Sequence, residues 1–141
     1  GYSVYCQLTR YPTLWTTGIA WIGITDLHRL YEEDMPHFQH QLRTQMGDPE
    51  ENHDLWRDRS PIEHVGSVER PLSMIHGVND PRCPVEQARL FRDALLDRGW
   101  TAGEDGEFEY TELGEEGHGS TDIAQKIRVF RLLEDYLDRR L

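Results

Sequence analysis

Two short loops decide the fold of this chain: residues 76–82, His-Gly-Val-Asn-Asp-Pro-Arg, and residues 115–119, Glu-Glu-Gly-His-Gly. Each loop follows a strand-like run and precedes a run with helical periodicity. The first loop offers the carboxylate of Asp80, and the second offers the imidazole of His118. A carboxylate and then a histidine, each placed after a strand, is the chain order of the acid and base in one class of hydrolase with a serine nucleophile.

The periodicity around these loops predicts an α/β domain with about three parallel strands and flanking helices. Residues 17–25 and 71–77 are short apolar runs, typical of strands that are buried on both faces of a parallel sheet. Residues 107–113 alternate with period two, which predicts a half-exposed strand nearer a sheet edge. Helical spacing begins almost at once, over residues 2–10, and Tyr11-Pro12 ends it.

Two further helices are predicted, one after each loop. The first has Pro84 at its first helical position and Gly99 as its C-terminal stop. The second is capped by Ser120 or Thr121. Its predicted buried stripe consists of Ile123, Ile127, Phe130, Leu133, Leu137 and Leu141.

Residues 26–69 differ in kind from the rest, because they are polar, acidic and rich in histidine. We interpret them as a helical excursion from the sheet, with helices at about 27–46 and 49–58 and a break at Ser60-Pro61. His37 and His40 are three residues apart, a spacing that metal sites also use. No cysteine or paired carboxylate completes a site there, so we predict a solvated helix face and no metal.

The composition limits the classes of partner. A length of 141 residues suits one domain, and the net charge of -11 argues against nucleic acid or an anionic membrane surface as partner. No segment resembles a signal peptide or a bilayer-spanning helix. Cys6 and Cys83 are the only cysteines, and we expect free thiols and a cytoplasmic location.

The functional interpretation of Asp80 and His118 depends on the two residues occurring together. Alone, Asp80 fits an ordinary Asn-Asp-Pro turn, and His118 fits an exposed loop. Together, after adjacent strands and with one helix and one strand between them, they favour the acid and base of a catalytic triad. We expect the glycines on both sides of His118 to let the backbone bend sharply there.

The sequence resembles the C-terminal part of the peptidase domain of the prolyl oligopeptidase and acylaminoacyl peptidase family of serine peptidases, whose fold is the α/β-hydrolase fold. The resemblance runs over residues 1–141. It implies a partial α/β-hydrolase fold. It is carried by Gly1-Tyr2, Leu8–Pro12, Gly18–Ala20, Ser60–Ile62, His76–Pro84 and Glu116–Gly119.

The resemblance implies a role for three residues. Asp80 corresponds to the catalytic acid and His118 to the catalytic base, while Arg82 matches an arginine that hydrogen-bonds a substrate carbonyl in some members. Gly1-Tyr2 aligns with the end of the family's nucleophile elbow, Gly-x-Ser-x-Gly-Gly-Tyr. The nucleophilic serine is therefore expected three residues before Gly1, together with an elbow strand and a gating domain upstream. The competing interpretation makes Ser3 the nucleophile of a degenerate elbow, although no strand precedes it.

The resemblance implies a serine peptidase that hydrolyses short peptides without a cofactor, and a chain that is catalytically incomplete alone. An esterase or other acyl hydrolase of the same fold is the first alternative, since the fold does not fix the acyl group. A non-catalytic α/β binding module is the second. The excursion lies near the substrate pocket in the family, so Tyr31 or Trp56 could line it, and a homo-oligomer stays open.

The basic residues suggest one test of the chain's environment. Only Lys126 among the 15 basic residues is a lysine, which fits either a protein kept in concentrated salt or a GC-rich genome. At about 1 M salt the Debye length is only about 3 Å, so the repulsion within an acidic surface is screened. If the protein is halophilic, its free energy of unfolding should rise steeply with added salt in denaturant titrations. A free energy of unfolding that does not change with salt would favour codon bias as the reason for the scarcity of lysine.

Overall fold

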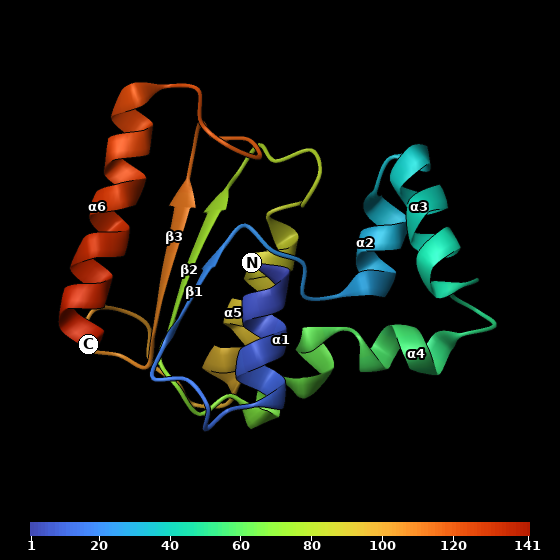
Figure 1. Cartoon of the computed structure of the whole chain (residues 1–141), viewed down its shortest axis with the longest axis horizontal. Coiled ribbons are helices and arrows are strands. Elements are labelled where there is room, and N and C mark those ends of the chain that lie inside the picture. Colours follow the sequence, from blue (N-terminus) through green and yellow to red (C-terminus); the bar gives the residue numbers. More distant parts are fainter.

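Three parallel strands form the centre of the fold. The computed structural model describes residues 1–141, and its sheet contains β1 (Gly18–Trp21), β2 (Leu72–Gly77) and β3 (Phe108–Leu113) in that order (Figure 1). Both strand pairs are parallel, as the sequence predicts. The chain therefore has the α/β architecture, with helices on both faces of the sheet.

The register of the sheet brings two strand ends together. Gly77, the last residue of β2, pairs with Leu113, the last residue of β3. Every residue of β2 is buried, because β2 is the central strand and helices cover both of its faces. The segments that follow β2 and β3 must therefore start side by side at one edge of the sheet.

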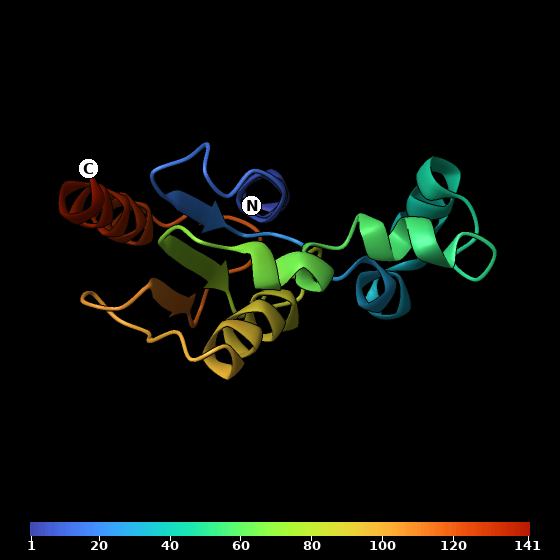
Figure 2. The same ribbon diagram turned by 90° about the horizontal axis from the view of Figure 1, so that it is seen from below.

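One face of the sheet is covered by three helical segments. These are α1 (Tyr2–Arg10), α5 (Glu86–Asp97) and the 3-10 helix η1 (Pro61–Ser67), which Figure 2 shows together on one side of the strands. Their apolar side chains form the main core with the strands, and burying such side chains supplies most of the driving force for folding. The buried members are Tyr5, Leu8, Ala20, Val68, Leu72, Met74, Phe91, Leu95 and Phe108.

The opposite face is covered by α6 (Ile123–Arg140) alone (Figure 2). Val129 packs against Ile75 and Leu113, and the hydroxyl of the buried Tyr136 lies 2.5 Å from that of Thr17. The predicted buried stripe of this helix is largely wrong. Only Leu133 of that stripe packs against this core, while others are exposed: Ile123 (72%), Ile127 (48%), Phe130 (62%) and Leu141 (83%).

The helix boundaries differ from the predictions where caps decide them. Asp122, not Ser120 or Thr121, caps α6, because its carboxylate accepts a hydrogen bond from the amide of Gln125. Helix α5 starts at Glu86, two residues after Pro84. Strand β1 ends at Trp21, short of the predicted end at 25, because Ile22 has a φ of 51°, which no strand accommodates.

The excursion is confirmed as helical but contains three α-helices before η1: α2 (Leu27–Glu33), α3 (Pro36–Met46) and α4 (His53–Asp58). The predicted single helix over 27–46 is wrong, because Pro36 forces Met35 into an extended conformation and begins a new helix. The three helices extend away from the sheet (Figure 1) and share a small core of Leu27, Leu30 and Trp56.

Buried polar side chains fix both ends of this excursion to the rest of the fold. The side-chain oxygen of Gln87, fully buried on α5, accepts from the amides of Thr25 (2.9 Å) and Asp26 (2.8 Å). The hydroxyl of Ser60 accepts from the amide of Leu27 (2.9 Å) and donates to the carbonyl of Trp56 (2.8 Å). The excursion is thus attached rigidly to the helix that follows the Asp80 loop.

None of the helices is both long and apolar enough to cross a bilayer.

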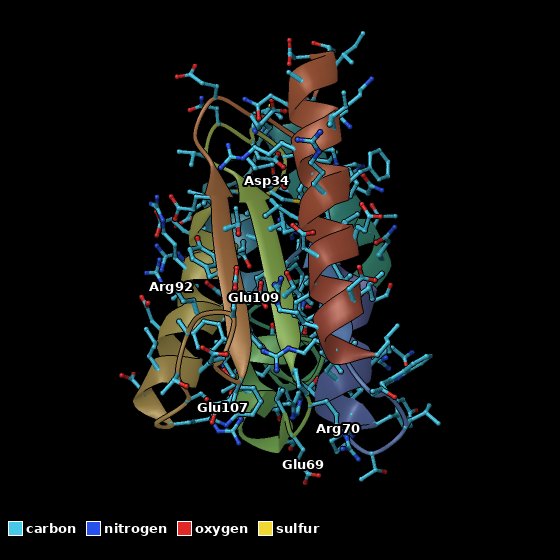
Figure 3. The ribbon with its side chains drawn as sticks, turned by 90° about the vertical axis from the view of Figure 1, so that its left-hand side faces the viewer. Asp34, Glu69, Arg70, Arg92, Glu107 and Glu109 are labelled. Atoms are coloured by element: carbon cyan, nitrogen blue, oxygen red, sulfur yellow. The ribbon has the colours of Figure 1, made fainter.

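Ion pairs attach β3 to its neighbours on both faces. On the α5 side, the guanidinium of Arg89 contacts both oxygens of Glu112, at 2.7 and 2.9 Å, and the Tyr110 hydroxyl donates to the same carboxylate. On the other side, Glu109 binds Arg139 of α6, and Figure 3 shows Glu109 beside that helix. The Arg89 contact lowers the pKa of Glu112 to about 2.

We expect Glu112→Gln to destabilise the fold by about 1–2 kcal/mol at neutral pH, since it removes a bidentate, charge-assisted pair. The folded-state pKa of Glu112 is depressed, so its contribution is complete above the unfolded value of 4.5 and is lost as the pH falls toward about 2. Urea titrations at several pH values should show the difference between the two proteins vanishing in acid. The exposed Glu69→Gln should change little, and a constant difference at every pH would contradict the assignment.

Candidate active site

The two loops that follow β2 and β3 are joined by backbone hydrogen bonds. The amide of Val78 donates to the carbonyl of Leu113 (3.0 Å), and the amide of Asn79 donates to that of Glu116 (2.9 Å). The side-chain amide of Asn79 also donates to the carbonyl of Gly114 (3.3 Å). The loops are therefore held together independently of the side chains that they carry.

This close approach requires the glycine at position 77. A Cβ atom added there would lie 2.3 Å from the carbonyl oxygen of Gly117 and 2.6 Å from that of Glu116. Real Cβ atoms essentially never come so close to another heavy atom, and both contacts are to backbone. Gly77 therefore sets how near the second loop can lie to the end of β2.

Asp80 is held by its own loop. Its side chain is fully buried, and Oδ1 accepts from the backbone amides of Arg82 (2.8 Å) and Cys83 (2.9 Å). The other oxygen, Oδ2, lies 2.9 Å from Nδ1 of His118. An ionised carboxylate accepts all of these bonds, so Asp80 has one fixed orientation.

His118 meets Asp80 as the sequence predicts. Because Asp80 faces Nδ1, that nitrogen carries the proton, and Nε2 keeps its lone pair as an acceptor. The side chain is 42% exposed and lines a cavity of about 620 Å³. The same cavity is lined by Gly1, Trp21, Cys83 and Phe130, among others. A histidine so oriented can accept a proton from a group in that cavity.

His76 closes the Asp80 loop from inside the fold. It is 1% exposed, and its Nε2 lies 2.7 Å from the carbonyl oxygen of Cys83, to which it donates. Burial lowers the pKa of His76, so the ring stays neutral and keeps this bond at ordinary pH. Its protonation in acid would favour the unfolded chain, so this support weakens as the pH falls.

The other candidates lie elsewhere. The side chain of Arg82 is exposed without a hydrogen-bond partner and does not line the cavity, although its amide binds Asp80. Ser3 is exposed on α1 and lines a separate hollow beside Trp15 and Thr17. His37 and His40 are exposed, as expected for a solvated face.

Tyr31 and Trp56 contact each other edge to face, with ring centroids 5.5 Å apart. They lie in the small core of the excursion rather than in the cavity beside His118.

Sequence reasoning missed three neighbours of the pair. The sequence predicts Gly77 and His76 only as members of the loop, and Cys83 only as a free thiol. The backbone bends at His118 and Gly119, as expected, although neither Gly117 nor Gly119 has a positive φ. The available signal was Gly77 itself, because a glycine that ends a buried strand often marks a close approach of another backbone.

The comparisons with known proteins concern the family and the fold of the chain. Residues 1–141 match the family model described as "Prolyl oligopeptidase family". "Uncharacterized peptidase YuxL" of Bacillus subtilis is 46% identical over 50 residues, 36% of this chain and 8% of that protein. "Esterase LipQ" of Mycobacterium tuberculosis is 31% identical over 118 residues, 81% of this chain and 26% of that protein.

The fold is shared with the acylaminoacyl peptidase of Pyrococcus horikoshii. Its structure superposes with a TM-score of 0.86 at 24% identity, covering 99% of this chain and 22% of that one. The sheet and its helices therefore form part of an α/β-hydrolase fold. The chain spans about a quarter or less of the length of these relatives.

Gly77→Ala tests how the two loops are held together. We expect the added methyl group to push the 115–119 loop off the end of β2 and to break the Asp80–His118 hydrogen bond. The free energy of unfolding should fall by about 1–3 kcal/mol, as for overpacked sites. Denaturant titration and the ring nitrogen shifts of His118 measure both effects.

Gly119→Ala is the matched control, because nothing lies within 4 Å of an added Cβ and its φ is not positive. Equal effects of the two substitutions would refute the role of Gly77.

Proposed function

Because this chain belongs to the prolyl oligopeptidase family, we propose that it carries the acid and base of a serine peptidase that cleaves peptide bonds in short peptides. The observation that carries the proposal is the 2.9 Å contact between buried Asp80 and Nδ1 of His118, at the edge of a cavity. In open α/β sheets, ligands bind outside the carboxyl ends of the strands, which is where this pair lies.

In the proposed reaction, Nε2 of His118 accepts the proton of a serine hydroxyl as that oxygen attacks the peptide carbonyl. The Nδ1–H group of the imidazolium that forms keeps its hydrogen bond to Asp80, and the buried carboxylate stabilises the positive charge of the ring. His118 then returns the proton to the leaving amine when the C–N bond breaks. A water molecule repeats these steps on the acyl-enzyme and releases the acid.

We infer that the nucleophile is a serine three residues before Gly1, and not Ser3. Gly1 lines the same cavity as His118, whereas Ser3 lines a different hollow. A Cβ at Gly1 would lie 2.1 Å from the carbonyl oxygen of Ile22, so the backbone here is packed against the end of β1. This supports an elbow immediately before Gly1, at the same sheet edge as the catalytic pair.

We propose that the upstream part of the protein covers the outer edge of the sheet. Strand β1 has a partner only on its β2 side, and Trp21 and Phe130 form an exposed aromatic pair beside it, with centroids 6.5 Å apart. A strand carrying the elbow would pair with β1 and cover these rings. Membership of the family further implies a gating domain in the upstream part. A second copy of this chain on the same face is the alternative.

Two alternative functions each rest on a specific finding. The 31% identity to a protein named as an esterase favours an acyl hydrolase that cleaves esters. The small share of each relative that the chain covers leaves room for a non-catalytic α/β binding module.

We also propose that Arg82 binds a substrate carbonyl, since its exposed guanidinium has no partner within the chain. A cytoplasmic location is proposed from its two free thiols, Cys6 and Cys83.

The proposal predicts a large loss of turnover in the full-length protein when either member of the pair is changed. Asp80→Asn should lower kcat by about 10⁴-fold, because the amide favours the wrong imidazole tautomer, and His118→Ala should lower it by at least as much. Rates on peptide amides and on simple esters should be measured side by side, and the preferred substrate separates peptidase from esterase.

The exposed His40→Ala serves as the control and should leave kcat unchanged. Full activity in correctly folded Asp80→Asn and His118→Ala proteins would favour the binding module. The 141-residue chain alone should be inactive, since loss of a serine nucleophile costs on the order of 10⁶ in turnover. Hydrolysis by this chain that Ser3→Ala abolishes would overturn the placement of the nucleophile.

A further inference from the structure

The thiol of Cys83 lies beside the proposed acid and base and has no part in their chemistry. One ligand atom from each of Asp80, Cys83 and His118 falls within 4.8 Å of the other two. Asp80 and Cys83 come from one loop and His118 from the other, and the backbone bonds between the loops keep all three together.

We propose that Asp80, Cys83 and His118 form a binding site for a soft or borderline divalent cation such as Cd²⁺ or Zn²⁺, which blocks the histidine. A carboxylate oxygen, an imidazole nitrogen and a thiolate are all ordinary zinc ligands. A cation held by three protein ligands keeps a fourth position for water. Two of the three ligands, Cys83 and His118, line the cavity, which gives water a route to the site.

The geometry needs only a small adjustment. Zinc–ligand bonds of about 2.0–2.3 Å place tetrahedral ligand atoms roughly 3.3–3.8 Å apart. The longest separation must therefore shorten by about 1 Å, and the 2.9 Å contact between Asp80 and His118 must lengthen by about 0.4 Å. Asp80 is fixed by the amides that bind Oδ1, which leaves Oδ2 for the cation. The side chains of Cys83 and His118 must make this movement, and they can rotate because both are partly exposed.

The ligand set selects the kind of cation. Thiolate and imidazole favour soft and borderline ions, whereas Mg²⁺ and Ca²⁺ require several oxygen ligands and find a single carboxylate here. Burial raises the pKa of Cys83 to about 11, so the free thiol is protonated and a poor nucleophile at neutral pH. Binding converts the thiol and the cation into a metal thiolate and one released proton, so affinity should rise with pH.

Occupancy would switch off proton transfer, a consequence that rests on the proposed function. A cation on Nδ1 of His118 moves the proton of the neutral ring to Nε2, and a cation on Nε2 takes the lone pair of that nitrogen. In either case the cation leaves Nε2 without a free lone pair. It also takes Oδ2 of Asp80, which otherwise faces Nδ1. The histidine then can neither be oriented by Asp80 nor accept a proton from a nucleophile.

Cadmium titration of the 141-residue chain tests the site without any activity. We expect a thiolate-to-cadmium absorption band in the ultraviolet for the wild type and for Cys6→Ser, and no band for Cys83→Ser. Cys6 is the matched control, because it is the chain's other partly buried free thiol. A missing band in the wild type, a band that survives Cys83→Ser, or equal loss in Cys6→Ser would overturn the proposal.

The other two ligands are tested by affinity. Asp80→Asn and His118→Ala should each weaken Cd²⁺ binding at least 10-fold, with circular dichroism verifying that each variant folds. Unchanged affinity in a folded variant would mean that the thiol binds alone, which contradicts the three-ligand site.

Zn²⁺ should reversibly inhibit hydrolysis by the full-length protein, and the rate of Cys83→Ser should resist Zn²⁺ when compared with that variant's own rate without zinc. Zinc inhibition that persists in Cys83→Ser would overturn the blocking role. A full-length protein without hydrolysis but with the cadmium band would refute the proposed function and leave the cation site standing.

Discussion

The hydrogen bond between Asp80 and His118 is the constraint on which the site depends, and it is decided mainly by backbone. Asp80 is fixed because two amides of its own loop bind Oδ1, and His76 closes that loop from the interior. The second loop is fixed because its carbonyl at Glu116 accepts from Asn79. The backbone therefore holds the two side chains in contact before any substrate binds, which is the preorganisation that a catalytic acid–base pair requires.

The sheet supplies this arrangement through its register. Parallel pairing ends β2 and β3 at Gly77 and Leu113, so both loops leave the sheet at one edge. The main core holds the strands in that register from the α1 and α5 side, while α6 alone covers the other. The polar contacts of Gln87 then connect the excursion to α5, the helix that continues from the Asp80 loop. One helix thus positions both the proposed acid and the start of the excursion, which follows the cavity-lining residues 21–24.

Much of this could be predicted from sequence, and the failures have physical causes. The three strands and the meeting of Asp80 with His118 follow from periodicity and chain order. The division of the excursion at Pro36 could also have been predicted, because proline restricts the residue before it. The orientation of α6 could not, since Ile123 and Phe130 fit a helical stripe that the described part of the fold leaves exposed. The role of Gly77 was not predicted, because it depends on the backbone of the 115–119 loop, which is distant in the sequence.

The tautomer of His118 tests the central claim most directly. The account requires the proton on Nδ1, facing Asp80, and a free lone pair on Nε2. Nitrogen-15 NMR of the neutral imidazole rings distinguishes the two tautomers. We predict an Nδ1-protonated ring that changes toward the Nε2-protonated form in Asp80→Asn. An Nε2-protonated ring in the wild type, unaffected by that substitution, would contradict the account.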